Sequence, residues 1–96
     1  FDAVICQNDV LARGCIEELE RNGCRVPQDV AVIGHDNSPD YVSYAHPLLT
    51  SIDDNNEMLG RQAALCLLDA IAGHPHHGVE RVPVKLIQRE STLPLD

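Results

Sequence analysis

Residues 29–37 read DVAVIGHDN, and this stretch decides the fold. The apolar run at positions 30–33 is short and rich in β-branched residues, which predicts a strand buried on both faces of a parallel sheet. Gly34 is expected to end this strand, so that the polar residues 35–37 follow its carboxyl end. Ligands of open α/β sheets bind outside the carboxyl ends of the strands. This edge is therefore a candidate binding site.

A second strand and a helix are expected before this stretch. Residues 3–6 form another apolar run, which predicts a buried strand. Asn8 or Asp9 then supplies the side-chain oxygen that caps a helix. The helix has apolar residues at helical spacing, namely Leu11, Ala12, Cys15, Ile16 and Leu19, and Gly23 provides a left-handed stop. A strand, helix and strand in this order predict a parallel βαβ unit.

The second half of the chain continues the alternation. Residues 38–46 form an irregular surface segment between two breakers, Pro39 and Pro47, and residues 48–52 form a third extended piece. A second helix begins at an N-cap, Asn55 or Asn56, and runs to about residue 72 with a buried apolar stripe. Its stripe comprises Leu59, Ala63, Cys66, Leu67, Ala70 and Ile71. A last strand over residues 82–87 and a polar tail from Arg89 complete the expected order.

Composition limits the classes of function. With 96 residues, 44% of them hydrophobic, the chain forms at most one small domain. The net charge of −8 argues against these residues gripping a phosphate backbone, which needs Lys and Arg. No apolar run approaches the roughly 20 residues of a membrane helix. The chain starts within an expected strand and has no signal-peptide pattern, so we expect a soluble fragment of a longer protein.

Cysteine and histidine do not indicate a metal centre. Four cysteines are present without a C-x-x-C pair or a zinc-ligand spacing, which predicts reduced, buried or partly buried thiols and a cytoplasmic protein. His74, His76 and His77 flank Pro75 in a loop with no carboxylate or Cys at a matching offset. We expect a solvated loop there, with no metal and no cofactor.

Six motifs, in order and at consistent spacing, resemble the lactose and galactose repressor family of bacterial transcription regulators. They are Asn8 and Asp9 with Ala12 and Gly14, then V-P-x-D-V from Val26, V-I-G-x-D-N from Val32, P-x-L-T from Pro47, M-x-G from Met58, and R-E-S-T from Arg89. The resemblance runs essentially end to end but covers only the last third of a typical member.

This resemblance implies an α/β fold of the periplasmic-binding-protein type I class, in which two lobes joined by crossover strands bind a small molecule between them. Residues 1–52 would belong to the C-terminal lobe. Residues 53–79 would form a crossover and a helix packing on the N-terminal lobe, and residues 80–96 the returning strand and tail. The helix-turn-helix headpiece and most of the N-terminal lobe would lie upstream.

The resemblance also implies effector contacts. Asn8 matches the family's ligand-binding amide, and Asp36 matches a carboxylate that accepts hydrogen bonds from sugar hydroxyls or purine N–H groups. Asp54 stands where many members have Gln, and Asn56 where some have an aromatic residue, which favours a polar effector such as a sugar. Asn8 is also interpretable as a helix cap only, Asp36 as the cap of a turn, and Asp53 and Asp54 as solvated charges or caps.

The first helix and residues 40–45 match the segments through which family members dimerise. Arg13, Ile16 and Tyr44 are therefore interface candidates, and Ile16 is equally consistent with the core. A homodimer would hold two upstream headpieces at the spacing of a palindromic operator. Effector binding would then bias that spacing.

Two other functions compete with this interpretation. A periplasmic sugar-binding protein of the same fold would bind ligand without DNA. An enzyme domain could hold Mg²⁺ at Asp53 and Asp54 or use Asp36 as a phosphoacceptor. Since the chain lacks the G-x-S-x-G, G-x-x-x-x-G-K-[ST] and G-x-G-x-x-G motifs, we expect it not to be an enzyme.

Overall fold

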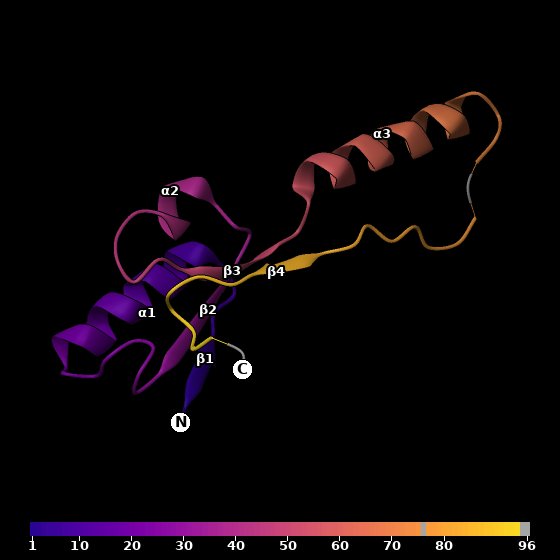
Figure 1. Cartoon of the computed structure of the whole chain (residues 1–96). Helices are drawn as coiled ribbons and strands as arrows, with labels where there is room; N and C mark the ends of the chain where they lie inside the picture. The colour runs from indigo at the N-terminus through magenta and orange to yellow at the C-terminus, as the bar shows by residue number, and fades with distance from the viewer. Residues whose placement is uncertain (76, 95–96) are drawn as a thin grey trace.

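The computed structural model describes residues 1–75 and 77–94. Strands and helices alternate along the chain (Figure 1). Their bounds are β1 Ala3–Ile5, α1 Asp9–Arg21, β2 Ala31–His35, α2 Pro39–Val42, β3 Thr50–Asp53, α3 Asn56–Ile71 and β4 Lys85–Ile87. The expected alternation is therefore present.

The four strands form one sheet in the order β1-β2-β3-β4. The first three run parallel, with Ala3 opposite Ala31 and Ile33 opposite Thr50, whereas β4 returns antiparallel to β3. The parallel βαβ unit predicted for the first half of the chain is thus observed. Because β1, β2 and β3 share one direction, their carboxyl ends lie at one edge of the sheet.

Helix α1 follows its predicted signals. Asn8 is the N-cap, and its Oδ1 accepts a 2.9 Å hydrogen bond from the backbone N–H of Leu11. Gly23, at φ +83°, takes the left-handed conformation just past the helix end. The buried face follows the helical period and comprises Asp9, Ala12, Arg13 and Ile16.

Strand β2 differs from its prediction in two ways. Gly34 lies inside the strand rather than ending it. Helix α1 packs directly over this position, which leaves no room for a side chain. A Cβ at this position would overlap Oδ1 of Asp9 and lie 3.0 Å from Cδ2 of Leu49. The strand is also buried on one face only, through Val32 and Gly34, while Ile33 on the other face is partly exposed.

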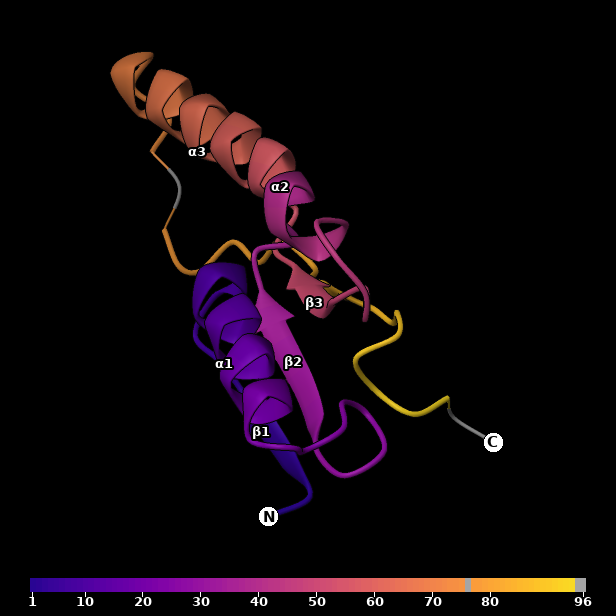
Figure 2. The same ribbon diagram turned by 90° about the vertical axis from the view of Figure 1, so that its left-hand side faces the viewer.

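The core forms where α1 and α2 cover one side of the sheet (Figure 2). Its buried members are Ala12, Ile16, Val26, Val32, Val42 and Leu49. Strand β1, predicted to be buried, is instead an edge strand whose Ile5 is 73% exposed. Pro39 was expected to break the chain but occupies the first turn of α2, where its missing N–H costs nothing.

All four cysteines are free and partly buried, as predicted. Burial raises the pKa of the Cys6 thiol, and the neighbouring Cys15 thiol raises it further. The Cys6 thiol is therefore held in its protonated, less reactive form.

The C-terminal segment is an integral part of the core rather than the expected polar tail. Ser91 is fully buried: its Oγ donates to the carbonyl of Val32 at 2.6 Å and accepts from the backbone N–H of Thr50 at 2.8 Å. The backbone carbonyl of Ser91 also accepts from the N–H of Val32 at 2.9 Å. This segment therefore joins β2 to β3 beyond their regular pairing.

Helix α3 projects away from the sheet (Figure 1). It has the predicted bounds, and Asn55 occupies the N-cap position, but the side chain of Asn55 does not cap the helix. The predicted stripe is not buried within this chain, since Leu59, Leu67 and Ile71 are 50%, 62% and 73% exposed. Strand β4 is also shorter than predicted and begins at Lys85. The radius of gyration is 17.5 Å, against about 13 Å for a compact domain of this size.

Candidate functional site

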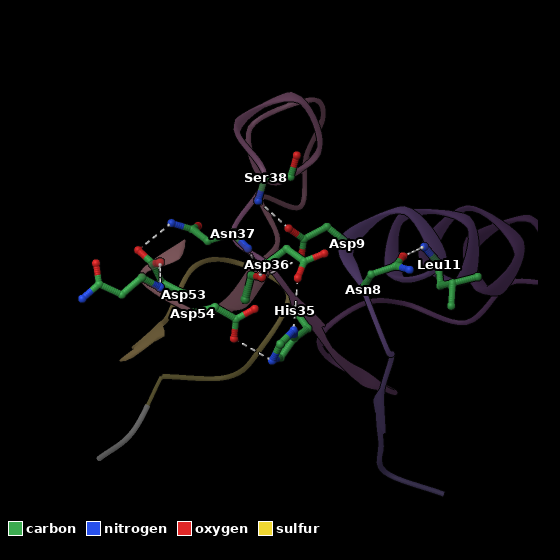
Figure 3. A network of polar contacts seen from close by, with 11 residues as sticks. Asn8, Asp9, Leu11, His35, Asp36, Asn37, Ser38, Asp53 and Asp54 are labelled. Carbon is green, nitrogen blue, oxygen red and sulfur yellow. Dashed lines mark hydrogen bonds and ion pairs between the residues drawn. The ribbon is translucent and has the colours of Figure 1, made fainter. Parts of the chain in front are cut away.

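The carboxyl ends of the three parallel strands present a cluster of polar side chains. Asn8 follows β1, Asp36 follows β2 and Asp54 follows β3, and all three lie at one edge of the sheet (Figure 3). These are three of the four predicted effector contacts. The sheet topology therefore brings together residues separated by 46 positions of sequence.

Asn8 is compatible with both of its predicted roles. Its Oδ1 caps α1, and no described residue accepts from its amide nitrogen. A carboxamide has two donors on that nitrogen. Capping the helix therefore leaves both donors for a ligand.

Asp36 is held in an unusual backbone conformation. Its φ is +102° and that of Asn37 is +54°, in the region that favours glycine. The Asp36 N–H donates to the carbonyl of Ile52 at 2.9 Å, which ties the residue to β3. Non-glycine residues in such conformations cost about 1–3 kcal/mol and cluster at ligand-binding sites.

His35 lies between two of the acidic residues. Its Nδ1 is 3.2 Å from Oδ1 of Asp36, and its Nε2 is 3.0 Å from Oδ1 of Asp54. His35 is the last residue of β2, and the sequence alone gave it no role. It connects the end of β2 to the segment that follows β3.

Asp9 supports the edge from inside. It is 1% exposed and accepts from the backbone N–H of Ser38 at 2.6 Å and from Oγ of Ser51 at 2.5 Å. Sequence reasoning treated Asp9 only as a possible cap. The signal for its role was Gly34, whose missing Cβ makes room for this carboxylate.

A second chain of hydrogen bonds fixes Asn37. Its Oδ1 accepts from Nη2 of Arg89 at 2.7 Å, and its Nδ2 donates to Oδ2 of Asp53 at 3.3 Å. Arg89 also donates from Nη1 to the carbonyl of Leu49 at 2.8 Å. The Asp53 side chain accepts from the N–H of Asn55, so it acts as a local cap, one of its two predicted roles.

Asn56, the fourth predicted contact, is the first residue of α3 and is exposed. Unlike Asn8, Asp36 and Asp54, it does not follow a parallel strand directly. Asn55 before it has φ +56°, which turns the chain from the edge into the helix.

The predicted interface residues fall into two groups. Ile16 is 1% exposed and belongs to the core, the alternative already considered. Arg13 is 5% exposed and donates to the carbonyls of Pro47 at 3.1 Å and Tyr41 at 2.8 Å, so it joins α1 to the segment around α2. These two side chains are used within the chain and offer little surface to a second copy. Tyr44 is 68% exposed, and its place in a dimer interface stays a prediction.

A metal ion could be considered at one cluster. His35, Asp36 and Asp54 offer ligand atoms within 4.8 Å of one another. However, the two carboxylates face opposite nitrogens of the ring, and one imidazole presents only one nitrogen to a given ion. The ring of His35 instead contacts both carboxylates, with a hydrogen bond to Asp36 and an ion-pair distance of 3.0 Å to Asp54. In the predicted solvated loop His74 and His77 are exposed, and His76 lies outside the described residues.

A large groove lies elsewhere on the described part of the chain. A groove of about 880 Å³ follows the amino ends of the strands, lined in part by Val26, His46, Arg89, Glu90 and Leu93. The backbone N–H of Leu48 and the His46 imidazole hold the pKa of Glu90 below its usual range. Because ligands of α/β sheets bind at the opposite edge, we do not assign the effector site to this groove.

Comparison with known proteins defines the class. A model of the periplasmic binding protein-like domain family matches residues 2–92, and the chain belongs to this family. The fold class and the resemblance stated from the sequence are confirmed. The chain is 39% identical over 94 residues to the HTH-type transcriptional repressor CytR of Escherichia coli K12. The aligned region covers 97% of this chain and 27% of CytR.

Two solved structures are similar throughout this chain. The dimeric Lac repressor with an 11-residue C-terminal deletion matches with a TM-score of 0.87 and 33% identity, covering 96% of this chain and 34% of the other. The complex of the transcriptional regulator CelR with cellobiose matches with a TM-score of 0.82 and 37% identity. The match covers 94% of this chain and 28% of the CelR chain. These relatives are transcription regulators, and this chain spans about a quarter of CytR.

Among the described residues, no helix combines the length and the apolar character needed to cross a membrane.

Proposed function

We propose that this chain is the effector-sensing and dimerising part of a bacterial transcription regulator. A small molecule binds between two lobes at the edge formed by Asn8, Asp36, Asp54 and Asn56. A sugar is the class of small molecule that this edge favours. Its binding controls attachment of an upstream helix-turn-helix to operator DNA. The observation that carries the proposal is the convergence of Asn8, Asp36 and Asp54 at the carboxyl edge.

The hydrogen-bonding capacity left at this edge supports a polyhydroxylated ligand. Asn8 keeps its amide donors, and no described residue donates to Oδ2 of Asp36 or of Asp54. A sugar presents paired hydroxyl groups that act as donors and acceptors, and a hydrogen bond to a charged group contributes about 1.5–3 kcal/mol. Cellobiose, which is bound in the similar CelR structure, is a ligand of this polyhydroxylated kind.

The exposed helix α3 supports a two-lobe arrangement. Leu59, Leu67 and Ile71 form an apolar face that a second lobe would cover, as proposed for residues 53–79. Residues 1–52 with the returning segment 80–96 then supply one wall of the pocket. This division explains why the polar edge is open in this chain.

The charge and the similar structures support the regulatory arrangement. With a net charge of −8, this segment is unsuited to DNA, so an upstream domain would bind the operator. The Lac repressor of the similar structure is dimeric, and Tyr44 is the exposed candidate for an equivalent contact. Four free thiols are consistent with a cytoplasmic location.

Two alternatives are weaker. A periplasmic sugar-binding protein would share the pocket, but the matched relatives are transcription repressors. An enzyme using Mg²⁺ at Asp53 and Asp54 is disfavoured because these carboxylates have different partners: Asp53 accepts hydrogen bonds from Asn37 and Asn55, and Asp54 lies 3.0 Å from Nε2 of His35.

The test is a thermal-shift screen of the full-length protein against cellobiose, lactose, ribose, galactose and purine nucleosides. We expect one sugar to raise the melting temperature by several degrees, since a ligand at 100 times its Kd stabilises by about 2.7 kcal/mol. The same sugar should change operator affinity in a gel-shift assay. Stabilisation by a sugar without any DNA binding would favour the periplasmic alternative, and sugar turnover would favour an enzyme.

A further inference from the structure

Residues 36–38, here called the edge loop, are fixed through every backbone N–H group that they contain. The first N–H donates to the carbonyl of Ile52 at 2.9 Å, and the second donates to Oγ of Ser51 at 3.0 Å. The third N–H donates to Oδ2 of Asp9 at 2.6 Å. Two different elements, β3 and α1, therefore hold one short loop at the polar edge (Figure 3).

These bonds explain how the edge loop keeps an unfavourable backbone conformation. Asp36 and Asn37 have φ angles of +102° and +54°, which residues other than glycine adopt only at a cost in free energy. Such conformations persist where the surrounding structure over-determines them. The acceptors on β3 and α1 supply this restraint, so the position of the Asp36 carboxylate depends on them.

Asp9 and Ser51 form a continuous hydrogen-bonded relay behind the edge loop, although they are 42 positions apart. Because Oγ of Ser51 accepts from the N–H of Asn37, its own proton is available, and it is donated to Oδ1 of Asp9 at 2.5 Å. The two oxygens of Asp9 thus serve two separate donors. An Asn side chain has a single oxygen, so it cannot replace the carboxylate in both contacts.

The burial of Asp9 needs a physical reason. Its side chain is 1% exposed, and burial of a charged group is costly unless that group is paired or hydrogen-bonded. Among the described residues, no Lys, Arg or His forms an ion pair with Asp9. The first turn of α1 places the carboxylate at the positive end of the helix dipole, and Gly34 leaves it space. The carboxylate therefore binds the edge loop instead of a cation.

We propose that Asp9 and Ser51 are positioning residues for the effector: they hold the edge loop so that the carboxylate of Asp36 meets the ligand. This inference rests on the proposed function of the polar edge. Both residues are buried, so they act through the loop rather than on the ligand itself. Loss of either residue should weaken effector binding without removing a ligand contact.

Ser91 provides a matched control for Ser51. Both hydroxyl groups are fully buried, and each accepts from one backbone N–H and donates to one oxygen. The partners of Ser91 are Thr50 and Val32, so this residue joins β2 to β3 inside the core and does not contact the edge loop. Ser51→Ala and Ser91→Ala should each lower the melting temperature of the full-length protein by about 2–6 °C. Stability alone therefore does not reveal positioning.

The first test needs no ligand. Hydrogen–deuterium exchange of full-length wild type, Ser51→Ala and Ser91→Ala is followed by mass spectrometry in peptides that cover the edge loop. Ser51→Ala removes an acceptor of the loop, so exchange there should become faster by roughly fivefold or more. Ser91→Ala should instead speed exchange at Thr50, whose N–H loses its acceptor. Edge-loop exchange in Ser51→Ala equal to that of wild type would overturn the proposal.

The second test measures effector affinity. Cellobiose, ribose and adenosine are titrated calorimetrically into the same three proteins and into Asp9→Asn, which keeps the size of the side chain. With the probe that binds wild type, Ser51→Ala and Asp9→Asn should each lower the affinity by about tenfold, and Ser91→Ala by less than about twofold. Because Asp9 and Ser51 act through one relay, the double variant should also lose about tenfold rather than about a hundredfold.

The outcomes separate this inference from the proposed function. Equal affinities of wild type and Ser51→Ala would overturn the positioning role and leave the proposed function standing. Equal losses in Ser51→Ala and Ser91→Ala would also overturn it, since affinity would then follow general stability. If none of the three probes binds wild type, the result counts against the proposed function, while exchange at the edge loop still decides whether the relay holds the loop.

Discussion

Arg89 donates a 2.7 Å hydrogen bond from Nη2 to Oδ1 of Asn37, although the two residues are 52 positions apart. This bond ties the C-terminal segment to the loop that carries Asp36. Arg89→Met should lower the free energy of unfolding by about 1.5–3 kcal/mol because a charged hydrogen-bonding group is lost. In a double-mutant cycle with Asn37→Gly, which tolerates the positive φ, we expect a coupling energy of about 1 kcal/mol.

The matched control for this cycle is Arg81→Met, an exposed position. It should change stability by less than about 0.5 kcal/mol. Strict additivity of Arg89→Met and Asn37→Gly in chemical denaturation would show that the bond contributes nothing.

Asp36→Asn should weaken effector binding. Asn tolerates the φ of +102°, so the substitution removes the charge with little disturbance of the backbone. Loss of about 1.5–3 kcal/mol of binding free energy corresponds to roughly 10- to 150-fold lower affinity. Calorimetry with the sugar found by the screen measures this affinity. Dimerisation, followed by light scattering, should stay the same. Asp2→Asn, at an exposed position, serves as the control, and equal affinities of the two variants would refute the contact.

Gly34→Ala should destabilise the protein by about 1–3 kcal/mol, because the added Cβ overlaps Asp9 and presses on Leu49. Gly14→Ala is the matched control: position 14 lies in α1, with no atom within 4 Å of the Cβ. Alanine there should stabilise by about 1 kcal/mol through helix propensity. Thermal unfolding of both variants checks this, and a neutral Gly34→Ala would mean that Asp9 can move aside.

The pair Arg25 and Asp29 predicts a pH effect at the turn before β2. Two hydrogen bonds from the guanidinium and one from the backbone N–H of Arg25 lower the pKa of Asp29 to about 2. The depressed pKa stabilises the fold above the ordinary value of 3.8, and this stabilisation is lost as pH falls toward 2.

Melting temperatures measured between pH 5 and pH 2 test this effect. Asp29→Asn should show a shallower loss of stability on acidification than wild type. Arg25→Met, which keeps the carboxyl but removes its guanidinium, should show the same shallower slope. Slopes that match wild type in both variants would exclude the pair as a source of acid sensitivity.

Tyr44 and Ile16 should respond in opposite ways. Tyr44→Asp places a charge on an exposed side chain and is expected to shift the dimer toward monomer without unfolding it. Ile16→Ala leaves a cavity in the core and should lower stability by about 2–5 kcal/mol. Light scattering and chemical denaturation separate the effects, and a Tyr44→Asp dimer of unchanged affinity would place the interface elsewhere.

Local signals in the sequence were sufficient for much of the fold. The cap at Asn8, the stop at Gly23 and the β-branched run before Gly34 each act over a few residues, so α1 and β2 were predictable. Once the strands are known to be parallel, the polar residues that follow them must share an edge. This reasoning placed residues 35–37 at a candidate binding edge, whereas Asn8 and Asp54 were added to the site by the resemblance to the repressor family.

Features that depend on distant contacts were not predictable. Gly34 was interpreted as a strand breaker because nothing local reveals that α1 presses the Asp9 carboxylate against it. Arg89 and Ser91 looked like a polar tail because their partners lie about 40 to 60 positions earlier. His35 pairs with a carboxylate on another strand segment, which a periodicity analysis does not register.

The position of α3 has a mechanical consequence. Among the described residues, the strands Thr50–Asp53 and Lys85–Ile87 lead out of the core toward this helix, and they pair as a two-stranded antiparallel connection. A helix of 16 residues is about 24 Å long, so a turn of about 10° at its base sweeps its far end through about 4 Å. Asp53 and Asp54 lie at the pivot. Small angular changes beside the polar edge are thus magnified at the far end of the exposed helix α3.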